Sequence, residues 1–144
     1  MRITVATGIL LAAIGVSAQP PAPVGLWQTV NESGQREALV RITEVDGELR
    51  GYVVTIFSPP APSAKPLCEE CPGELKNKPV VGLQILSGMR WDGERYSGGE
   101  ILDPDNGRLY RCTLRLVDNG RQLEVRGYVG VPIIGRTQTW QRVQ

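Results

Sequence analysis

Short runs of alternating apolar and polar residues recur along most of the chain, and turn-forming residues separate them. Runs rich in β-branched and aromatic residues with a period of two are typical of strands that bury one face. In the run 108–117, Cys112 and Leu114 share the apolar face, so Cys112 is expected to point into the core. The pattern predicts strands at residues 25–30, 38–45, 48–57, 80–86, 95–102, 108–117, 122–129 and 136–143.

The predicted strands follow one another through short turns. Asp46-Gly47 and Asp92-Gly93 are typical of type I′ hairpin turns, whose two central residues need positive φ. Because closing such a sheet removes its exposed edges, the sequence predicts an all-β fold, an eight-stranded antiparallel up-and-down barrel. Glycines inside the predicted strands indicate bends or bulges of the barrel wall, at Gly51, Gly82, Gly98, Gly99 and Gly127.

The two ends of the strand series resemble each other, with Trp27-Gln28-Thr29-Val30 near the start and Trp140-Gln141-Arg142-Val143 at the finish. If the last strand pairs antiparallel with the first, Trp27 faces the neighbourhood of Trp140 and Arg142. A guanidinium over an indole contributes about 0.5–2 kcal/mol. The alternative is coincidence, since Trp and Gln are ordinary strand residues.

Residues 1–18 have the features of a cleavable secretory signal, with Arg2 followed by an apolar run and small residues around Ala18. The apolar run is shorter than the roughly 20 residues of a transmembrane helix. We therefore expect an exported, periplasmic protein with no transmembrane segment in the mature chain. Residues 19–24 form a Pro-rich leader, and residues 25–144 are expected to form a single barrel domain.

Charge and composition narrow the classes of function. Without Arg2, 15 of the 16 basic residues remain against 15 acidic residues, a balance that argues against a nucleic-acid partner. The chain has no histidine, which removes Ser-His-Asp and Cys-His catalysis and the zinc enzymes that use histidine. An enzyme is therefore the least favoured class, and no catalytic residue, cofactor or metal is predicted.

The segment 58–79 is the one long loop that the strand pattern predicts, and it contains Cys68-Glu69-Glu70-Cys71 and six of the 11 prolines. A redox pair is disfavoured, because the two glutamates raise the thiol pKa and no helix follows. A zinc site would need further ligands, since structural zinc takes four. A disulfide between Cys68 and Cys71 is the favoured interpretation, and pairing of either with Cys112 is the alternative.

Two further segments suggest sites. Residues 103–107 resemble a calcium loop, but the glycine comes one position early and no glutamate follows at the required distance, so a hairpin turn is expected. The apolar loop GVPIIG at 130–135 could form a lip at the barrel mouth or a plug in one barrel end. Candidates for a ligand or partner surface are Tyr110, Cys112, Arg126, Tyr128, Ile133 and Ile134.

The residues also resemble known families. Gly25-Leu26-Trp27 on the first strand, with Arg142 on the last, is similar to the signature of the calycin barrels, which include the lipocalins. In those barrels the arginine packs across the tryptophan, and Arg142 fits this role better than Arg136. A more extensive resemblance, to exported bacterial proteins of the domain of unknown function 2147 family, rests on GLWQTV, the CxxC loop, KPVVGLQIL, GGEILDPDNGRLYRC and LEVRGYVGVPIIGRTQTWQRV. This resemblance implies a calycin-like fold and no established activity.

Two functions are compatible with these features. A barrel of this size either is filled by side chains or holds one small ligand, so the first hypothesis is binding of a small apolar or amphipathic molecule. The second is a protein-interaction or inhibitor module of the cell envelope that acts through the 58–79 loop. Fold analogy alone supports the first hypothesis.

Overall fold

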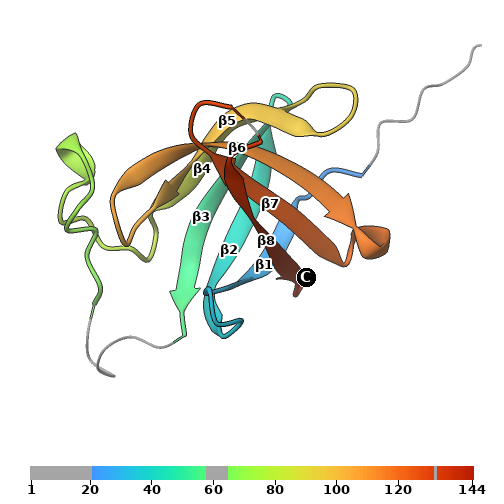
Figure 1. Ribbon diagram of the computed structural model, residues 1–144. Helices are drawn as coiled ribbons and strands as arrows, with labels where there is room; N and C mark the ends of the chain where they lie inside the picture. Colours follow the sequence, from blue (N-terminus) through green and yellow to red (C-terminus); the bar gives the residue numbers. More distant parts are fainter. Residues whose placement is uncertain (1–20, 58–64, 132) are drawn as a thin grey trace, which may run out of the picture.

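The computed structural model describes residues 21–57, 65–131 and 133–144, and the proposed signal segment lies outside them. Figure 1 shows eight strands wrapped into one closed barrel in which each strand pairs antiparallel with the next. The predicted fold class is therefore confirmed. The strands are β1 (Gly25–Val30), β2 (Arg36–Val45), β3 (Glu48–Ile56), β4 (Gln84–Trp91), β5 (Tyr96–Asp103), β6 (Arg108–Val117), β7 (Gln122–Tyr128) and β8 (Gly135–Arg142).

The helical content of the described residues is two short 3-10 turns, η1 (Gly73–Leu75) and η2 (Asp118–Gly120). Neither is long and apolar enough to cross a membrane. The up-and-down order gives the barrel two ends. The end with the turns 46–47, 92–95 and 118–121 is called the base, and the end with the connections 31–35, 57–83, 104–107 and 129–134 is called the mouth.

One of the two predicted type I′ turns is present. Asp46 and Gly47 have φ of 52° and 80° and join β2 to β3 directly. The prediction for Asp92-Gly93 was wrong, because there only the glycine has positive φ. The Asp92 carboxylate instead accepts hydrogen bonds from the backbone N–H of Glu94 and Arg95 and from the hydroxyl of Ser97, and this closes a longer turn.

The predicted strand 80–86 was misplaced, because β4 spans Gln84–Trp91. Val80 belongs to the loop, where its N–H donates to the carbonyl oxygen of Pro66. Gly82 has φ of 92° and turns the chain into β4, so it is not inside a strand. The tertiary contact to Pro66 therefore overrides the β-branched pair Val80-Val81.

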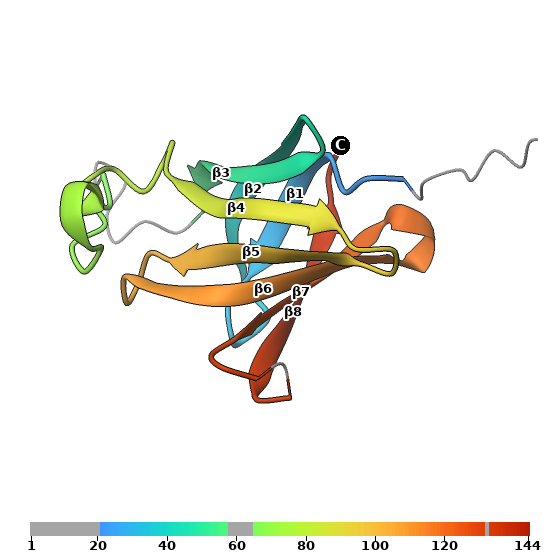
Figure 2. The same ribbon diagram turned by 90° about the horizontal axis from the view of Figure 1, so that it is seen from above.

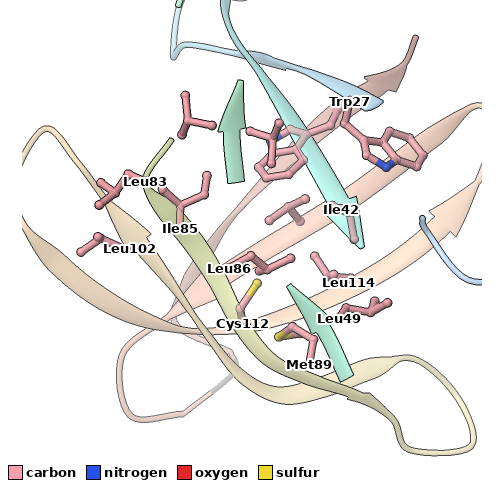
Figure 3. Close-up of a cluster of buried hydrophobic side chains, with 14 of the residues drawn as sticks. Trp27, Ile42, Leu49, Leu83, Ile85, Leu86, Met89, Leu102, Cys112 and Leu114 are labelled. Carbon is pink, nitrogen blue, oxygen red and sulfur yellow. The ribbon is translucent and has the colours of Figure 1, made fainter. Parts of the chain in front are cut away.

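Large apolar side chains form one buried cluster, and Figure 3 shows that it runs from Trp27 and Leu49 near the base to Leu83, Ile85 and Leu102 near the mouth ends of β4 and β5. The fully buried residues include Trp27, Ile42, Leu49, Leu86, Met89, Cys112, Leu114, Leu123 and Trp140. Small residues let the strands close round this core. A Cβ on Gly99 would collide with the carbonyl oxygen of Ser87, so only glycine permits β4 and β5 to lie so close there.

The seam between β1 and β8 closes the barrel, and it is short. Trp27 pairs with Arg142 and Gln28 with Gln141, and these are the register positions that join the two strands. The Arg142 guanidinium lies 4.3 Å from the centre of the Trp27 ring. Arg136, the other sequence candidate for this role, lies near the mouth and forms an ion pair with Glu32.

Candidate functional site

The mouth half of the barrel differs from the base half in what faces inward. On β8, Gln138 and Arg136 share the face of the buried Trp140, yet both are exposed. On β6, Tyr110 shares the face of Cys112 and is half-buried. On β6 and β8, the inward face therefore becomes more exposed and more polar toward the mouth.

Apolar side chains cover the floor of this mouth half. Ala38, Ile56 and Ile101 are partly buried and pack against the core. Ala38 pairs with Ile56 across β2 and β3, and Ile101 pairs with Tyr110 across β5 and β6. Gly127 faces the same floor, because a Cβ there would touch Tyr110 and Ile101 at ordinary van der Waals distances. An apolar floor with polar groups above it suits an amphipathic molecule.

Three carboxyl groups lie around the mouth. Burial raises the pKa of Glu37, and the charges of Asp105 and Asp103 raise it further. Burial also raises the pKa of Asp105, with a contribution from Asp103. Asp103 and Asp105 belong to the β5–β6 turn, where the Asp103 carboxylate accepts the Asp105 N–H. Carboxyl groups in this state disfavour a further negative charge, so a neutral or cationic head group suits the mouth better than an anionic one.

Cys68 and Cys71 form a disulfide with a Cα–Cα distance of 5.3 Å, which confirms the predicted pairing. The sulfurs are not part of a solvent-exposed loop, because Cys68 is fully buried and Cys71 nearly so. The Cys68 Sγ lies 3.7 Å from the carbonyl oxygen of Pro104 in the β5–β6 turn. Figure 2 shows residues 65–79, called the disulfide segment, in green beside that turn, outside the barrel wall. The prediction for residues 58–64 lies outside the described residues.

Gly107 makes this docking possible. Its φ is 69°, and a Cβ on it would collide with the backbone of Glu70 and Cys71. The turn of β5–β6 and the disulfide segment therefore touch backbone to backbone. The sequence DPDNG signalled a turn, but nothing local in it indicated that the glycine also serves a contact with a distant loop.

Cys112 is a buried free thiol. Burial raises its pKa to about 12, so it is an inert thiol at neutral pH. Among the described residues, no group of three or more Cys, Asp or Glu side chains is arranged to hold a metal ion.

The six candidate surface residues do not form one site. Tyr110 and Cys112 are on the inward face of β6, whereas Arg126 and Tyr128 are on the outer face of β7, opposite in direction to Gly127. Ile133 and Ile134 are in the β7–β8 loop and are 84% and 70% exposed. The loop is therefore a lip rather than a plug. Sequence analysis missed Glu37, Gln138 and Gly127 as mouth residues, because only the register shows which way they face.

The described surface has a polar cleft of about 190 Å³ on the outer wall of β6, β7 and β8. It is lined by Arg95, Thr113, Arg115, Glu124, Arg126 and Thr137. A second cleft of about 270 Å³ lies between the disulfide segment and the start of β4, and it is lined by Leu75, Lys78, Pro79, Val81, Gly82, Leu83 and Gln84.

Comparison with known proteins gives a family for this chain and a solved structure of similar fold. Residues 25–142 match the family model described as an uncharacterized protein conserved in bacteria, DUF2147. The chain belongs to the DUF2147 family. No curated protein matches it significantly. Among solved structures, this DUF2147 protein is similar to protein HP1028 from Helicobacter pylori, described as a member of the lipocalin family, with a TM-score of 0.73 and 24% identity over 85% of this chain and 84% of that chain. The DUF2147 barrel is thus lipocalin-like in fold.

Proposed function

We propose that the mouth half of the barrel binds a small apolar or amphipathic molecule. The observation that carries this proposal is the change along the inward face, from fully buried apolar residues at the base to Tyr110, Gln138 and the half-buried Ala38, Ile56 and Ile101 at the mouth. Because Trp27, Met89 and Trp140 fill the base, the ligand lies shallow. Its apolar part packs on the floor and its head group remains near Tyr110.

Gly127→Leu tests the location of this ligand. The leucine side chain would fill the mouth beside Tyr110 and Ile101 without backbone strain, since the φ of Gly127 is not in the left-handed region. Thr139→Leu, on the outer wall of β8, is the matched control. With the neutral fluorescent probe N-phenyl-1-naphthylamine, the expected loss of affinity is about tenfold for the mouth variant, from lost apolar contact. Equal affinity in both variants would place the probe elsewhere and contradict the proposal.

Native mass spectrometry of the protein purified from cells tests ligand binding itself. A bound molecule of constant mass, released by mild collision and diminished in Gly127→Leu, is the expected result. A ligand retained equally by both variants would argue for a site outside the mouth.

Binding of an envelope protein is the second candidate. The observation in its favour is the cleft beside the disulfide segment, where Leu75 and Val81 are 36% and 49% exposed. A purified candidate partner should bind Leu75→Gln/Val81→Gln about tenfold more weakly than wild type if this cleft is the interface. Unchanged affinity would exclude the cleft.

We further propose that residues 1–18 direct export to the periplasm and are then removed. The short apolar run after Arg2 and the small residues around Ala18 support this assignment. The intact mass of protein from a periplasmic fraction is expected to correspond to a chain that begins near Gln19. An uncleaved chain in the cytoplasmic fraction would contradict it.

A further inference from the structure

Gln138 is an exposed polar side chain on the inward face of β8, and a buried tryptophan fixes its orientation. Trp140 lies two residues further along the same face and is only 2% exposed. Its indole N–H donates to Gln138 Oε1 at 3.1 Å. Because an indole N–H can only donate, the amide oxygen of Gln138 has to face the tryptophan. The Nε2 group, with its two N–H donors, therefore faces away from Trp140, and it has no partner among the described residues.

Tyr110, on the inward face of β6, is in a similar state. The Asn106 side-chain N–H donates to the Tyr110 oxygen at 3.0 Å. Asn106 is itself oriented, because its Oδ1 accepts the backbone N–H of Arg108 at 2.9 Å. The Tyr110 oxygen is therefore the acceptor in this contact, and its own O–H remains able to donate. In the part of the chain that the structure describes, this O–H has no acceptor.

These two side chains flank one strand of the barrel. β7 lies between β6 and β8, and it places Gly127 on the inward face, where a Cβ would touch Tyr110. A ligand that lies over Gly127 can therefore be approached by donors from both neighbouring strands. The unused hydrogens of Tyr110 and Gln138 are all donors, so they favour a ligand atom that accepts hydrogen bonds.

The charges around the mouth limit what this acceptor can be. A carboxylate head group would accept the bonds, but it would also meet the carboxyl groups of Glu37, Asp103 and Asp105, which already act on one another. The positive charge on the same inward face, Arg136, is ion-paired with Glu32. An ammonium head group would suit the carboxyl groups, but it accepts no hydrogen bond. A neutral carbonyl oxygen accepts from both donors and adds no charge.

We propose that Gln138 and Tyr110 bind the carbonyl oxygen of a neutral ester or amide head group, so that the ligand of the mouth is an uncharged acyl compound. This inference rests on the proposed binding of an amphipathic molecule in the mouth, and it adds the class of head group. The Gln138 Nε2–H and the Tyr110 O–H donate to the carbonyl oxygen, and the acyl chain packs on the apolar floor beside Gly127.

Competition between ligands of matched chain length tests the selection of head group. Methyl decanoate, decanoate and decyltrimethylammonium carry a neutral ester, an anion and a cation, and each is used to displace N-phenyl-1-naphthylamine. The ester is expected to bind the wild type about tenfold more tightly than either ion, because it alone combines both hydrogen bonds with no charge. An ester that binds no more tightly than the ions would overturn the inference.

Gln138→Glu tests the amide donors directly. The glutamate keeps an oxygen for the Trp140 indole and replaces the two amide N–H groups by a negative charge. The ester is expected to bind this variant about tenfold more weakly, and decyltrimethylammonium about threefold more tightly. Gln141→Glu, the same change at an exposed position on the outer face of β8, is the matched control and should leave both affinities unchanged. A merely structural role of Gln138 would weaken all three ligands alike, which would contradict the inference.

Tyr110→Phe removes the second donor and keeps the ring. It is expected to weaken binding of the ester about fivefold and to leave binding of decyltrimethylammonium unchanged. Tyr128→Phe, on the outer face of β7, is its control. Probe binding that is weakened by Gly127→Leu, together with equal affinities for the ester and the ions, would overturn this inference and leave the proposed site in place. A probe that binds Gly127→Leu as tightly as wild type would contradict both.

Discussion

At the scale of single residues, Arg142 joins parts of the base that lie far apart in the sequence. Its guanidinium covers Trp27, its Nε–H donates to the carbonyl oxygen of Gly120 at 2.7 Å, and another N–H donates to Val24 at 2.8 Å. The Trp27 indole N–H in turn donates to the carbonyl oxygen of Pro23 at 2.9 Å. One side chain therefore connects the leader, β1, η2 and β8.

Arg142→Ala is expected to lower the free energy of unfolding by about 2–3 kcal/mol, from one cation–π contact and two charge-assisted hydrogen bonds. Urea denaturation followed by tryptophan fluorescence measures this loss of free energy of unfolding. Arg121→Ala, an exposed arginine in the neighbouring turn, is the control and should change stability by less than about 0.5 kcal/mol. Equal effects of the two changes would show that the Trp27 contact contributes nothing.

Glu37 makes stability depend on pH in a defined direction. Burial and the two aspartates raise its pKa in the folded state, so the folded protein binds the proton more tightly than the unfolded chain does. The stabilisation that comes from binding this proton is fully present below the pKa of Glu37 in the unfolded chain. It is lost as the pH rises through the higher pKa of Glu37 in the folded protein. At neutral pH the ionised carboxylate therefore destabilises the fold.

Glu37→Gln is expected to be more stable than wild type at pH 7, and the difference should shrink toward zero near about pH 3, where glutamate is protonated in both states. Thermal melts of both proteins across this pH range measure the difference in stability. Glu74→Gln, on the exposed part of the disulfide segment, is the control. A Glu37→Gln variant that is less stable at pH 7 would show that the carboxylate has a favourable partner.

At the scale of elements, the disulfide segment and the β5–β6 turn form one unit outside the barrel wall. Within the segment, the N–H of Cys68 donates to Lys78 and the N–H of Asn77 to Cys68, so its two arms are bonded to each other. Gly107 provides the backbone contact that holds this hairpin-like segment against the turn. The disulfide joins residues only three positions apart, so it fixes the local shape of the disulfide segment. The docking of the segment on the β5–β6 turn depends instead on packing.

Gly107→Ala is expected to detach this segment. Amides of residues 67–78 should exchange hydrogen about tenfold faster or more in the variant, because their protection depends on the docked state. Gly120→Ala is a matched control, since Gly120 also has positive φ but has no atom near the position of its Cβ. Both variants carry the cost of a non-glycine residue in the left-handed region, about 1 kcal/mol. Unchanged exchange in Gly107→Ala would contradict the role of this contact.

The sequence predicts these elements well where the signal is local. The alternation in 108–117 identified β6 with both of its ends. The Asp46-Gly47 turn identified the ends of β2 and β3 that flank it, whereas β2 begins two residues earlier and β3 ends one residue earlier than predicted. The sequence predicts an element poorly where contacts outside the local pattern determine its structure. Val80 is one case, because its N–H donates to the carbonyl oxygen of Pro66, and Asp92 is another, because its carboxylate organises a longer turn. The mouth depends on register and bulges. The bulge between Gln28 and Val30, for example, alters the pairing beside Glu37, and no local pattern shows this.

At the scale of the whole molecule, one core joins the barrel and the disulfide segment. Cys68, Cys71 and Val80 belong to the same buried cluster as Trp27 and Trp140. With this shared core and a continuous sheet, the chain should unfold as a single cooperative unit. Tryptophan fluorescence and far-ultraviolet circular dichroism are expected to give coincident urea transitions, and separate midpoints would contradict a shared core.

The pairing of Trp27 with Arg142 also has a consequence for how the protein is made. These partners stand at opposite ends of the described chain, and contacts between such distant residues form slowly, because a long loop must close first. Until β8 has been synthesised, β1 is an open edge able to pair with another chain. A newly made molecule therefore passes through a stage prone to aggregation, and this stage ends only when β8 is available to pair with β1.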